Sequence, residues 1–374
     1  MARTVVGIND PKAVKKYSVA LSLDASQRAY WNSRFMGSGA NAETPLQVHT
    51  DLERDAGEEI KYDLLAELRM EPIEGDDILE GKEEGQRFYT DSIYIDQARC
   101  GVNTGGRMTR KRTIHNLREK AKRQQASWWA RFFDELCFIY LSGARGVNEN
   151  FITRVGYTGR ANNALTAPSA NQHFFGGSAT SFANLAANDK MDLPVIDKLV
   201  TRAETQGGGA TDIPVLQPCK IDGEEHFVLV MHKFQEDDLR KASGGASWLE
   251  IQKALASAIG RASPIFKGGL GMYRNVILHS HRNAIRFANA GAGGNVEAAR
   301  ALFLGAQAGV VAFGSPGTGM RFDWNEESRD NNNMVVITTS SIFGVKKTTF
   351  TMPESNGAAQ DFGVYACDTA AASR

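Results

Sequence analysis

A long amphipathic stretch between Thr109 and Gly143 constrains the fold of this chain more than any other feature of its sequence. Apolar side chains recur at helical spacing from Ile114 to Ile139, and neither glycine nor proline interrupts them before Gly143. The pattern predicts a single helix of roughly thirty residues, about 50 Å long and well beyond the ordinary globular length. Such a helix must span a whole lobe of the protein. Gly143 and Gly146 are typical of its C-terminal end.

Two runs of alternating bulky and polar residues before this helix predict strands at 60–64 and 88–95. Segment 71–85 between them is rich in Glu, Asp and Gly and has too few apolar residues to form a packed body. We therefore expect a long hairpin, or ribbon, with an acidic tip. Residues 1–50 carry small apolar clusters among polar residues, and we interpret them as an arm with little core of its own.

The middle third alternates helical and strand patterns, which is typical of an α/β lobe built around one sheet. We expect the end of the chain to return to β structure, and segment 143–190 to form a surface loop or arm. The predicted elements, in chain order, are a helix over 193–203 capped by Asp192, a strand at 227–231, a helix over 248–259, a strand at 276–278, a helix that begins over 296–302, and strands at 335–339 and 342–345.

Charge is unevenly distributed along a chain whose 43 basic and 43 acidic residues balance. Residues 51–90 hold fourteen acids against five bases, whereas 107–123 hold eight bases against one acid. The bases lie at the start of the predicted helix, where the helix dipole disfavours positive charge, so we expect them to meet a negative partner. The candidate contact residues are Arg107, Arg110, Lys111, Arg112 and Arg118 on the helix, and Glu71, Glu74, Asp76, Asp77 and Glu80 on the ribbon.

Three partners for these bases remain open: water, nucleic acid or the acidic ribbon. Nucleic acid has less support, because the chain is neutral overall and Trp128 and Trp129 lie beyond the basic stretch. The ribbon tip stands far from its own base, so it can reach the helix of a neighbouring copy more readily than its own. Each exposed ion pair contributes only about 0 to 1 kcal/mol, but contacts repeated around a closed ring would set orientation and register.

The motifs that usually signal a reaction centre are absent from the sequence. It contains no GxxxxGK[ST], HExxH, GxSxG or EF-hand pattern, and the glycines at 269 and 271 precede a strand, which indicates a turn. The four cysteines are too widely spaced for a zinc site or a small disulfide framework. His279 and His281, alternate residues at a strand end, are the best metal candidates, but no acidic residue lies close to them in sequence. We expect no catalytic, cofactor or metal site, and therefore no enzyme.

The sequence also lacks a signal peptide and any apolar run of about 18 residues that could cross a membrane. We expect the protein to be made, and to stay, on the cytosolic side.

Several short motifs, in this order, resemble those of a podophage-associated family of tailed-bacteriophage major capsid proteins with the Hong Kong 97 fold. The resemblance runs from about residue 55 to the C-terminus. The segments that carry it are 91–97 (DSIYIDQ), 163–168 (NALTAP), 189–191 (DKM), 264–273 (PIFKGGLGMY), 276–279 (VILH) and 342–347 (IFGVKK).

The resemblance implies an α+β fold of the Hong Kong 97 type and a structural subunit rather than a catalyst. Its implied parts are an N-terminal arm at 1–55, an extended β-hairpin loop at 56–106, a peripheral domain with a spine helix and surface arm at 107–189, an α/β axial domain at 190–330, and a C-terminal β return to the peripheral domain at 331–374.

The implied function is self-assembly, as hexamers and pentamers, into the icosahedral shell that encloses a double-stranded DNA genome. The implied partners are other copies of the chain, a portal protein at one vertex, a decoration protein, and packaged DNA contacted non-specifically at the inner surface, with no membrane. Because only about 55 residues precede the ribbon and they lack a heptad run, we expect a separate scaffolding protein and no fused scaffold. We predict no covalent cross-link. The expected location is the virion, after assembly in the host cytoplasm.

Two other functions remain as alternatives. One is a nucleic-acid-binding protein that uses the basic segment 107–123, and the more distant one is a hydrolase built around His279 and His281.

Overall fold

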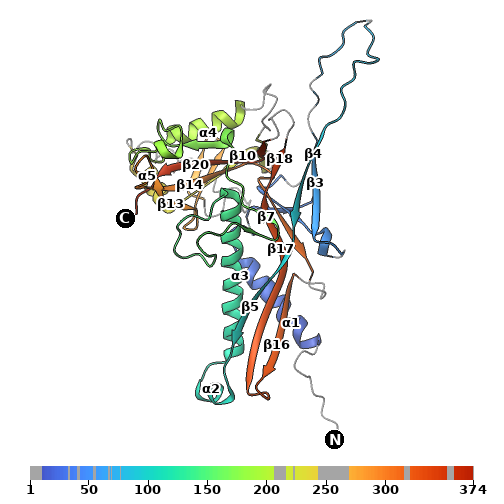
Figure 1. Cartoon of the computed structure of the whole chain (residues 1–374), viewed down its shortest axis with the longest axis vertical. Coiled ribbons are helices and arrows are strands. Elements are labelled where there is room, and N and C mark those ends of the chain that lie inside the picture. Colours follow the sequence, from blue (N-terminus) through green and yellow to red (C-terminus); the bar gives the residue numbers. More distant parts are fainter. Residues whose placement is uncertain are drawn as a thin grey trace.

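The computed structural model describes residues 11–373, apart from 33, 40–42, 54–55, 66–67, 69, 76, 206–215, 222–223, 243–268, 316–320 and 352–357. A long helix runs beside one mixed sheet and reaches a second, and a hairpin extends beyond the body at one end (Figure 1). The helix expected over 248–259, the first half of the 264–273 motif and the candidate contact residue Asp76 lie outside the described residues.

The long helix is α3 (Leu117–Ser142), and its ends are set by local sequence. Asn116 caps the N-terminus, where its side chain accepts a hydrogen bond from the Glu119 backbone N–H at 3.4 Å. Gly143 ends the helix in the left-handed conformation, with φ 69°. A Cβ at this position would lie 2.1 Å from the Thr166 carbonyl oxygen, so only glycine lets the loop approach so closely. The predicted C-terminal end is confirmed.

The predicted start of the helix is wrong. A separate helix α2 (Arg107–Arg112) precedes α3, and residues 113–116 between them are not helical. At its 26 residues, α3 is therefore about 39 Å long. The break has a tertiary cause, because the turn at Asn333 holds α2. The Arg107 backbone N–H donates to Asn333 Oδ1 at 3.1 Å, and the Arg110 guanidinium donates to the Asn333 carbonyl oxygen at 3.0 Å.

The first sheet packs along α3 in the order β1-β2-β15-β17-β16, and β5 pairs with the opposite edge of β17. A single 14-residue strand, β17, replaces the two strands predicted at 335–339 and 342–345. It continues through Ser340 and Ser341 because both are paired on two sides, with β5 and with β16. The strands are β1 (Met36–Ser38), β2 (Leu46–His49), β5 (Asp96–Asn103), β15 (Gly309–Gly314), β16 (Phe322–Arg329) and β17 (Met334–Lys347).

The N-terminal segment packs on the body of its own chain. Helix α1 (Pro11–Arg28) contacts both α3 and β16 (Figure 1). Leu21, Trp31 and Phe35 are fully buried in the core that α3 shares with the first sheet. The expected arm without a core is therefore wrong for the described residues of this segment. Its apolar clusters are too small to fold alone, but they complete a core that the rest of the chain provides.

The predicted ribbon is confirmed. Strands β3 (Glu59–Leu65) and β4 (Phe88–Tyr94) pair antiparallel along their whole length, from Glu59 opposite Tyr94 to Leu65 opposite Phe88. Ile60 and Ile93 at the base of the hairpin are buried against β15, which attaches the ribbon to the first sheet.

The second sheet has the strand order β11-β12-β10-β14-β20-β8, with β9 paired to β10 and β13 to β14. Leu229 and Leu278 lie on the face covered by α4, whereas Val228 and Ile277 pack in the core around α3. The elements are β8 (His173–Phe175), α4 (Leu193–Thr205), β9 (Cys219–Ile221), β10 (Glu224–Met231), α5 (Lys233–Lys241), β11 (Gly271–Tyr273), β12 (Val276–Ser280), β13 (Arg286–Ala290), β14 (Val296–Leu304) and β20 (Val364–Ala370). The strands predicted at 227–231 and 276–278 and the helix over 193–203 are confirmed.

The helix predicted from 296 is wrong, because these residues form β14. The strand lies in the middle of the sheet, between β10 and β20, and every residue from 298 to 304 is buried. A strand covered on both faces has a nearly continuous apolar run and loses the alternation that identifies a strand in sequence.

The sheets also cross the expected domain boundaries. Strands β15 and β16, expected in the axial domain at 190–330, belong to the first sheet, and β20 leaves the segment 331–374 to join the second. Segment 143–190 is more than a surface loop, since it contributes β8 to the second sheet and forms a small hairpin of β6 (Gly159–Arg160) and β7 (Asn163–Ala164). A further pair, β18 (Thr349–Thr351) and β19 (Ala359–Asp361), packs against Tyr62, Leu64 and Tyr89 of the ribbon.

Candidate interaction site

The acidic loop, residues 68–87 between β3 and β4, extends beyond the body of the molecule. Glu71, Glu74, Asp77 and Glu80 are exposed and make no hydrogen bond or ion pair with any described residue. The loop also exposes apolar side chains that the sequence analysis did not single out: Leu68, Met70, Ile78 and Leu79. A surface that combines unpaired carboxylates with exposed aliphatic groups is suited to a partner that offers both cations and apolar surface.

The basic elbow, residues 107–118, consists of α2, the non-helical residues 113–116 and the start of α3. Arg107, Lys111 and Arg112 are exposed there and have no side-chain partner among the described residues. Two large apolar side chains are exposed beside them: Met108, and Ile114, which is 101% exposed. A hollow of about 390 Å³ at the elbow is lined partly by apolar groups, Leu117 and Val335, and partly by Arg110 and His115.

The expected unfavourable interaction between the helix dipole and the basic residues does not occur at three of these residues. Arg110, Lys111 and Arg112 lie in the last turn of α2, where positive charge interacts favourably with the dipole. The first turn of α3 carries the acidic Glu119. The exposure of these bases, and not their position on a helix, is what leaves them available to a partner.

Two of the five candidate bases have partners within the chain. The Arg118 guanidinium donates to Glu326 Oε1 at 2.6 Å, and Glu326, which is buried, also accepts a hydrogen bond from the Trp324 indole at 2.8 Å. Arg110 is held by Asn333, as described above. These two residues are therefore structural supports of the elbow, and Arg107, Lys111 and Arg112 are the candidate bases without a side-chain partner among the described residues.

The acidic loop and the basic elbow lie at opposite ends of the molecule. In Figure 1 the loop reaches past β3 and β4 at the top, whereas α2 lies at the bottom, beyond the far end of α3. One chain cannot bring its own loop onto its own elbow in this conformation. Contacts between two such separated and complementary surfaces are heterologous, and they close into a ring when the rotation between copies permits it.

A set of buried ionic contacts links the second sheet to the end of α3 and the end of β17 to the β18–β19 pair, and its two halves interact electrostatically. This junction network consists of His173, Arg300, Lys347, Asp361 and Asp368. Arg300 donates twice to the Asp368 carboxylate, at 2.7 Å each, and once to the Ser142 carbonyl oxygen at the end of α3, also at 2.7 Å. His173 lies 2.7 Å from the same carboxylate. The contacts fix the end of the long helix on the second sheet.

The other half of the network pairs Lys347, from the first sheet, with Asp361 at 2.8 Å. Lys347 also donates to the carbonyl oxygens of Thr166 and Ala167, at 3.1 and 3.3 Å. Burial lowers the pKa of Lys347 and raises that of Asp361, so part of the attraction between them is offset by desolvation. At Asp368 burial also acts to raise the pKa, but the charge and hydrogen bonds of Arg300 outweigh it and the pKa is lowered.

His279 and His281 do not form a metal site. His279 is completely buried, with its ring 5.2 Å from that of Phe35, and the His281 ring stacks on Phe138 at 5.1 Å. Burial lowers the pKa of His281 to about 4, so this ring is neutral at physiological pH. No group of three or more potential metal-binding side chains occurs in the part of the chain that the structure describes. Both imidazoles pack against aromatic rings, His279 in the core and the half-buried His281 at its edge.

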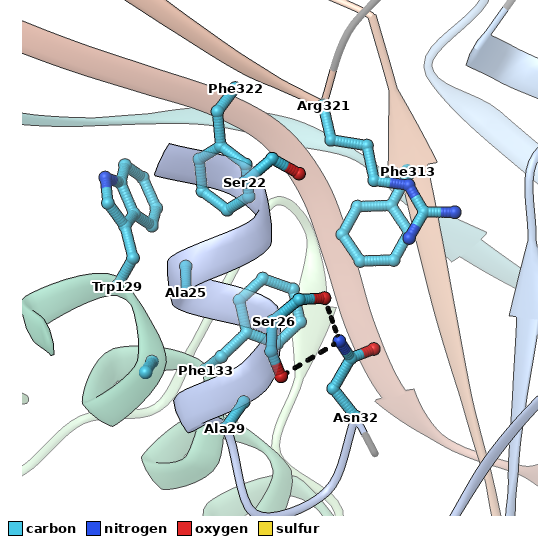
Figure 2. Close-up of a pocket in the computed structure, with 11 residues that line it drawn as sticks. Ser22, Ala25, Ser26, Ala29, Asn32, Trp129, Phe133, Phe313, Arg321 and Phe322 are labelled. Carbon is cyan, nitrogen blue, oxygen red and sulfur yellow. Dashed lines mark hydrogen bonds between the residues drawn. The ribbon is translucent and has the colours of Figure 1, made fainter. Parts of the chain in front are cut away.

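A small cavity lies beneath α1, lined by Trp129, Phe133, Phe313 and Phe322 (Figure 2). Its volume is about 40 Å³, roughly the space of one or two water molecules, whereas ligand pockets usually exceed about 300 Å³. Figure 2 also shows the Asn32 amide donating to Ser26, which ties the chain back onto α1. The cavity is therefore a packing defect between α1 and the core, and it has no room for a substrate.

The cysteines show no sign of reactivity. Three of the four are buried. Burial raises the pKa of Cys137 and of Cys367, and it raises the pKa of Cys219 to about 12. Among the helices that the structure describes, none combines the length and the hydropathy needed to cross a membrane.

Comparison with known proteins gives a consistent result. A family model described as phage capsid protein matches residues 5–373. The major capsid protein of Pseudomonas phage KPP25 is 28% identical, over 95% of this chain and 94% of that protein. Among solved structures, the capsid of Ralstonia phage GP4 is 45% identical, with a TM-score of 0.84 over 100% of this chain and 99% of that one. The capsid of cyanophage Pam1 shares the fold, with a TM-score of 0.69 and 21% identity over 93% and 94% of the two chains.

Proposed function

Because this chain belongs to the phage capsid protein family, we propose that the acidic loop of one copy binds the basic elbow of the next within a shell. The chain is a major capsid protein with the Hong Kong 97-type fold, a structural subunit that self-assembles into the shell of a tailed phage and is part of the virion. The match of the family model to nearly the whole chain carries this assignment. The nucleic-acid-binding alternative at 107–123 is not supported, and Arg110 and Arg118 have partners inside the chain.

The position and chemistry of the two surfaces support the proposed contact. The loop and the elbow lie at opposite ends of the subunit, so contact between them requires a second copy. Glu71, Glu74 and Asp77 are unpaired on the loop, and Arg107 and Lys111 are unpaired on the elbow, among the described residues. Exposed apolar groups on both surfaces add a hydrophobic component to the contact.

The finer features of the assembly are also proposals, and they rest on the family assignment. The ring contacts would generate hexamers and pentamers of an icosahedral shell around double-stranded DNA, assembled in the host cytoplasm with a separate scaffolding protein. A portal protein would occupy one vertex, and a decoration protein would bind the outer surface. We assign the first sheet with α3 to the peripheral domain and the second sheet to the axial domain.

Charge reversal tests the proposed contact. An elbow variant carries Arg107→Glu, Lys111→Glu and Arg112→Glu, and a loop variant carries Glu71→Lys, Glu74→Lys and Asp77→Lys. Each variant alone should stay folded, as judged by circular dichroism, and should fail to form shells in negative-stain microscopy. A chain with all six substitutions should assemble again. The matched control, Arg99→Glu with Arg154→Glu and Lys198→Glu, changes the same charge at exposed positions that also make no ion pair with a described residue, and it should assemble normally.

Mixing the two variants separates a contact between copies from one within a copy. In an alternating ring, each reversed loop meets a reversed elbow and each native loop meets a native elbow. Alternation closes in a ring of even number and fails in an odd one, so the mixture should give hexamers, sheets or tubes but no closed shells. Normal assembly of the elbow variant alone would disprove the contact, and so would rescue in the six-substitution chain without rescue in the mixture.

A further inference from the structure

A groove lined by arginines lies between the end of α1, the middle of α3 and the turn after β12. Its volume is about 480 Å³. Four guanidinium groups line it, from Arg28, Arg34, Arg131 and Arg282. We call it the arginine groove. The positions come from three separate parts of the sequence, so no single charged run could have indicated the site.

The four arginines make no short ion pair, although Arg34 interacts electrostatically at longer range with Asp134, and Arg131 with Glu135. None of them makes an ion pair with a described residue, whereas Arg274, Arg286 and Arg321 elsewhere on the surface each lie within 4 Å of a carboxylate. Arg28, Arg131 and Arg282 are exposed, and Arg34 is half-buried with its guanidinium 5.3 Å from the Tyr30 ring centroid. Four like charges in one groove repel each other, so an anion that binds there is strongly favoured.

The carboxylate of the groove, Asp134, is occupied by the backbone. It accepts hydrogen bonds from the Tyr30 N–H at 2.8 Å and from the Trp31 N–H at 3.3 Å. Burial raises the pKa of Asp134 to about 7, so the group is about half ionised at neutral pH and becomes uncharged as the pH falls below that. Asp134 therefore orients the turn that carries Arg34 and offsets only part of the positive charge of the four arginines.

The shape and chemistry of the groove favour phosphate over the carboxylates of another copy's acidic loop. The loop carries exposed Ile78 and Leu79, and the elbow offers exposed Met108 and Ile114 to match them. The arginine groove has no large exposed apolar side chain among its lining residues. Guanidinium groups match the oxygens of a phosphate with paired hydrogen bonds, which a polar groove permits.

We infer that the arginine groove binds the phosphate backbone of a nucleic acid strand. The inference rests on the proposed function, because a shell subunit meets the packaged genome on one of its faces. It assigns the contact to a site distinct from the basic elbow. The binding is independent of sequence, since phosphates position a strand without specifying its bases.

The test uses the full-length, unassembled subunit and a short fluorescein-labelled DNA duplex, with binding followed by fluorescence anisotropy over a range of salt concentrations. The groove variant carries Arg28→Gln, Arg131→Gln and Arg282→Gln. The control variant carries Arg107→Gln, Lys111→Gln and Arg112→Gln and loses the same charge at the elbow. Each phosphate contact contributes about 0.9 to the slope of log affinity against log salt, so the groove variant should lose about 2.7 of the slope. The control should keep the wild-type slope.

Competition distinguishes the possible ligands. A peptide of residues 68–87 and inorganic phosphate are added separately to the complex of subunit and duplex. Neither should displace the duplex from wild type when added at the same concentration of anionic groups. Displacement by the peptide, lost in the groove variant, would identify the groove as a receptor for another copy's acidic loop and would overturn the inference. Displacement by inorganic phosphate would reduce the groove to a simple anion site and would overturn it too.

Two further results would count against the groove as the DNA site: equal loss of binding in both variants, which would reflect net charge alone, and an unchanged slope in the groove variant. Shell formation by the same proteins, viewed by negative-stain microscopy, is measured independently. The groove variant should assemble normally. If wild type failed to assemble, the proposed function would fail whatever the anisotropy showed.

Discussion

Replacing Asp368 by Asn tests how much the junction network stabilises the second sheet and its contact with the end of α3. The Asp368 carboxylate is completely buried and accepts two hydrogen bonds from Arg300, which is 6% exposed. An amide at this position can accept from only one of the guanidinium nitrogens. Its NH₂ group would face a donor nitrogen of Arg300 in either orientation, and His173 as well in one of them, because these groups lie 2.7 Å from the carboxylate oxygens. The substitution therefore leaves a buried guanidinium charge without its counter-ion.

The expected cost follows from that burial. Removing one partner of a buried ion pair costs about 3 to 5 kcal/mol, because the remaining charge stays desolvated. The exposed pair of Arg329 and Glu327, with N and O atoms 2.9 Å apart and side chains 60% and 57% exposed, provides the matched control. Exposed pairs contribute about 0 to 1 kcal/mol, so Glu327→Gln should have little effect at a similar atomic distance.

The assay is urea unfolding of the unassembled subunit at pH 7, followed by circular dichroism, together with hydrogen exchange of the amides in β14 and β20. Asp368→Asn should lower the urea midpoint and speed exchange in both strands, whereas Glu327→Gln should change neither. Because the pKa of Asp368 is lowered in the folded chain, its stabilisation is present above its ordinary value of 3.8 and is lost as the pH falls through the folded value. The two proteins should therefore differ less in acid.

Equal, small effects of the two substitutions would refute this account of the network. A second check is the double variant Arg300→Met with Asp368→Asn, which removes the stranded charge. It should be more stable than the sum of the two single effects predicts. Simple additivity would mean that Arg300 and Asp368 are not energetically coupled.

Two further predictions concern the long helix. Asp134→Asn should remove a pH dependence of stability. Because burial raises the pKa of Asp134 in the folded chain to about 7, the free energy of unfolding of wild type should fall by up to about 4 kcal/mol as the pH rises from about 4 to 7. The variant should lack this slope in urea titrations. Hydrogen bonds to Tyr30 and Trp31 can be kept by the amide oxygen, and an unchanged slope would contradict the assignment. Gly143→Ala should cost at least about 2 kcal/mol in urea unfolding, from its left-handed backbone and its clash with the carbonyl of the loop. Gly156 provides the control, because its φ is 81° and no atom lies within 4 Å of an added Cβ, so Gly156→Ala should show only the backbone cost of about 1 to 2 kcal/mol. Equal effects at the two glycines would show that the clash at Gly143 is relieved.

Local sequence determined several parts of this protein. The helical stripe and Gly143 fixed the body and the end of α3, since a cap and a left-handed glycine act within one turn. The alternating runs identified β3 and β4, and the composition between them identified the acidic loop. Short motifs in order were enough to indicate the family.

Tertiary structure decided the rest, because the deciding partners are far away in sequence. Asn333 holds α2 apart from α3, and Glu326 pairs with Arg118 within the chain. The basic run in the sequence therefore could not show which bases of the elbow are left without a partner. Burial on both faces made β14 a strand with no alternating pattern. The junction network and the arginine groove each combine residues from distant segments. The charges in the sequence gave no signal of which charged side chains would form ion pairs within the chain. A sequence specifies which groups carry charge and apolar surface, but only the folded chain determines which of them find partners inside the molecule and which are left for a neighbour.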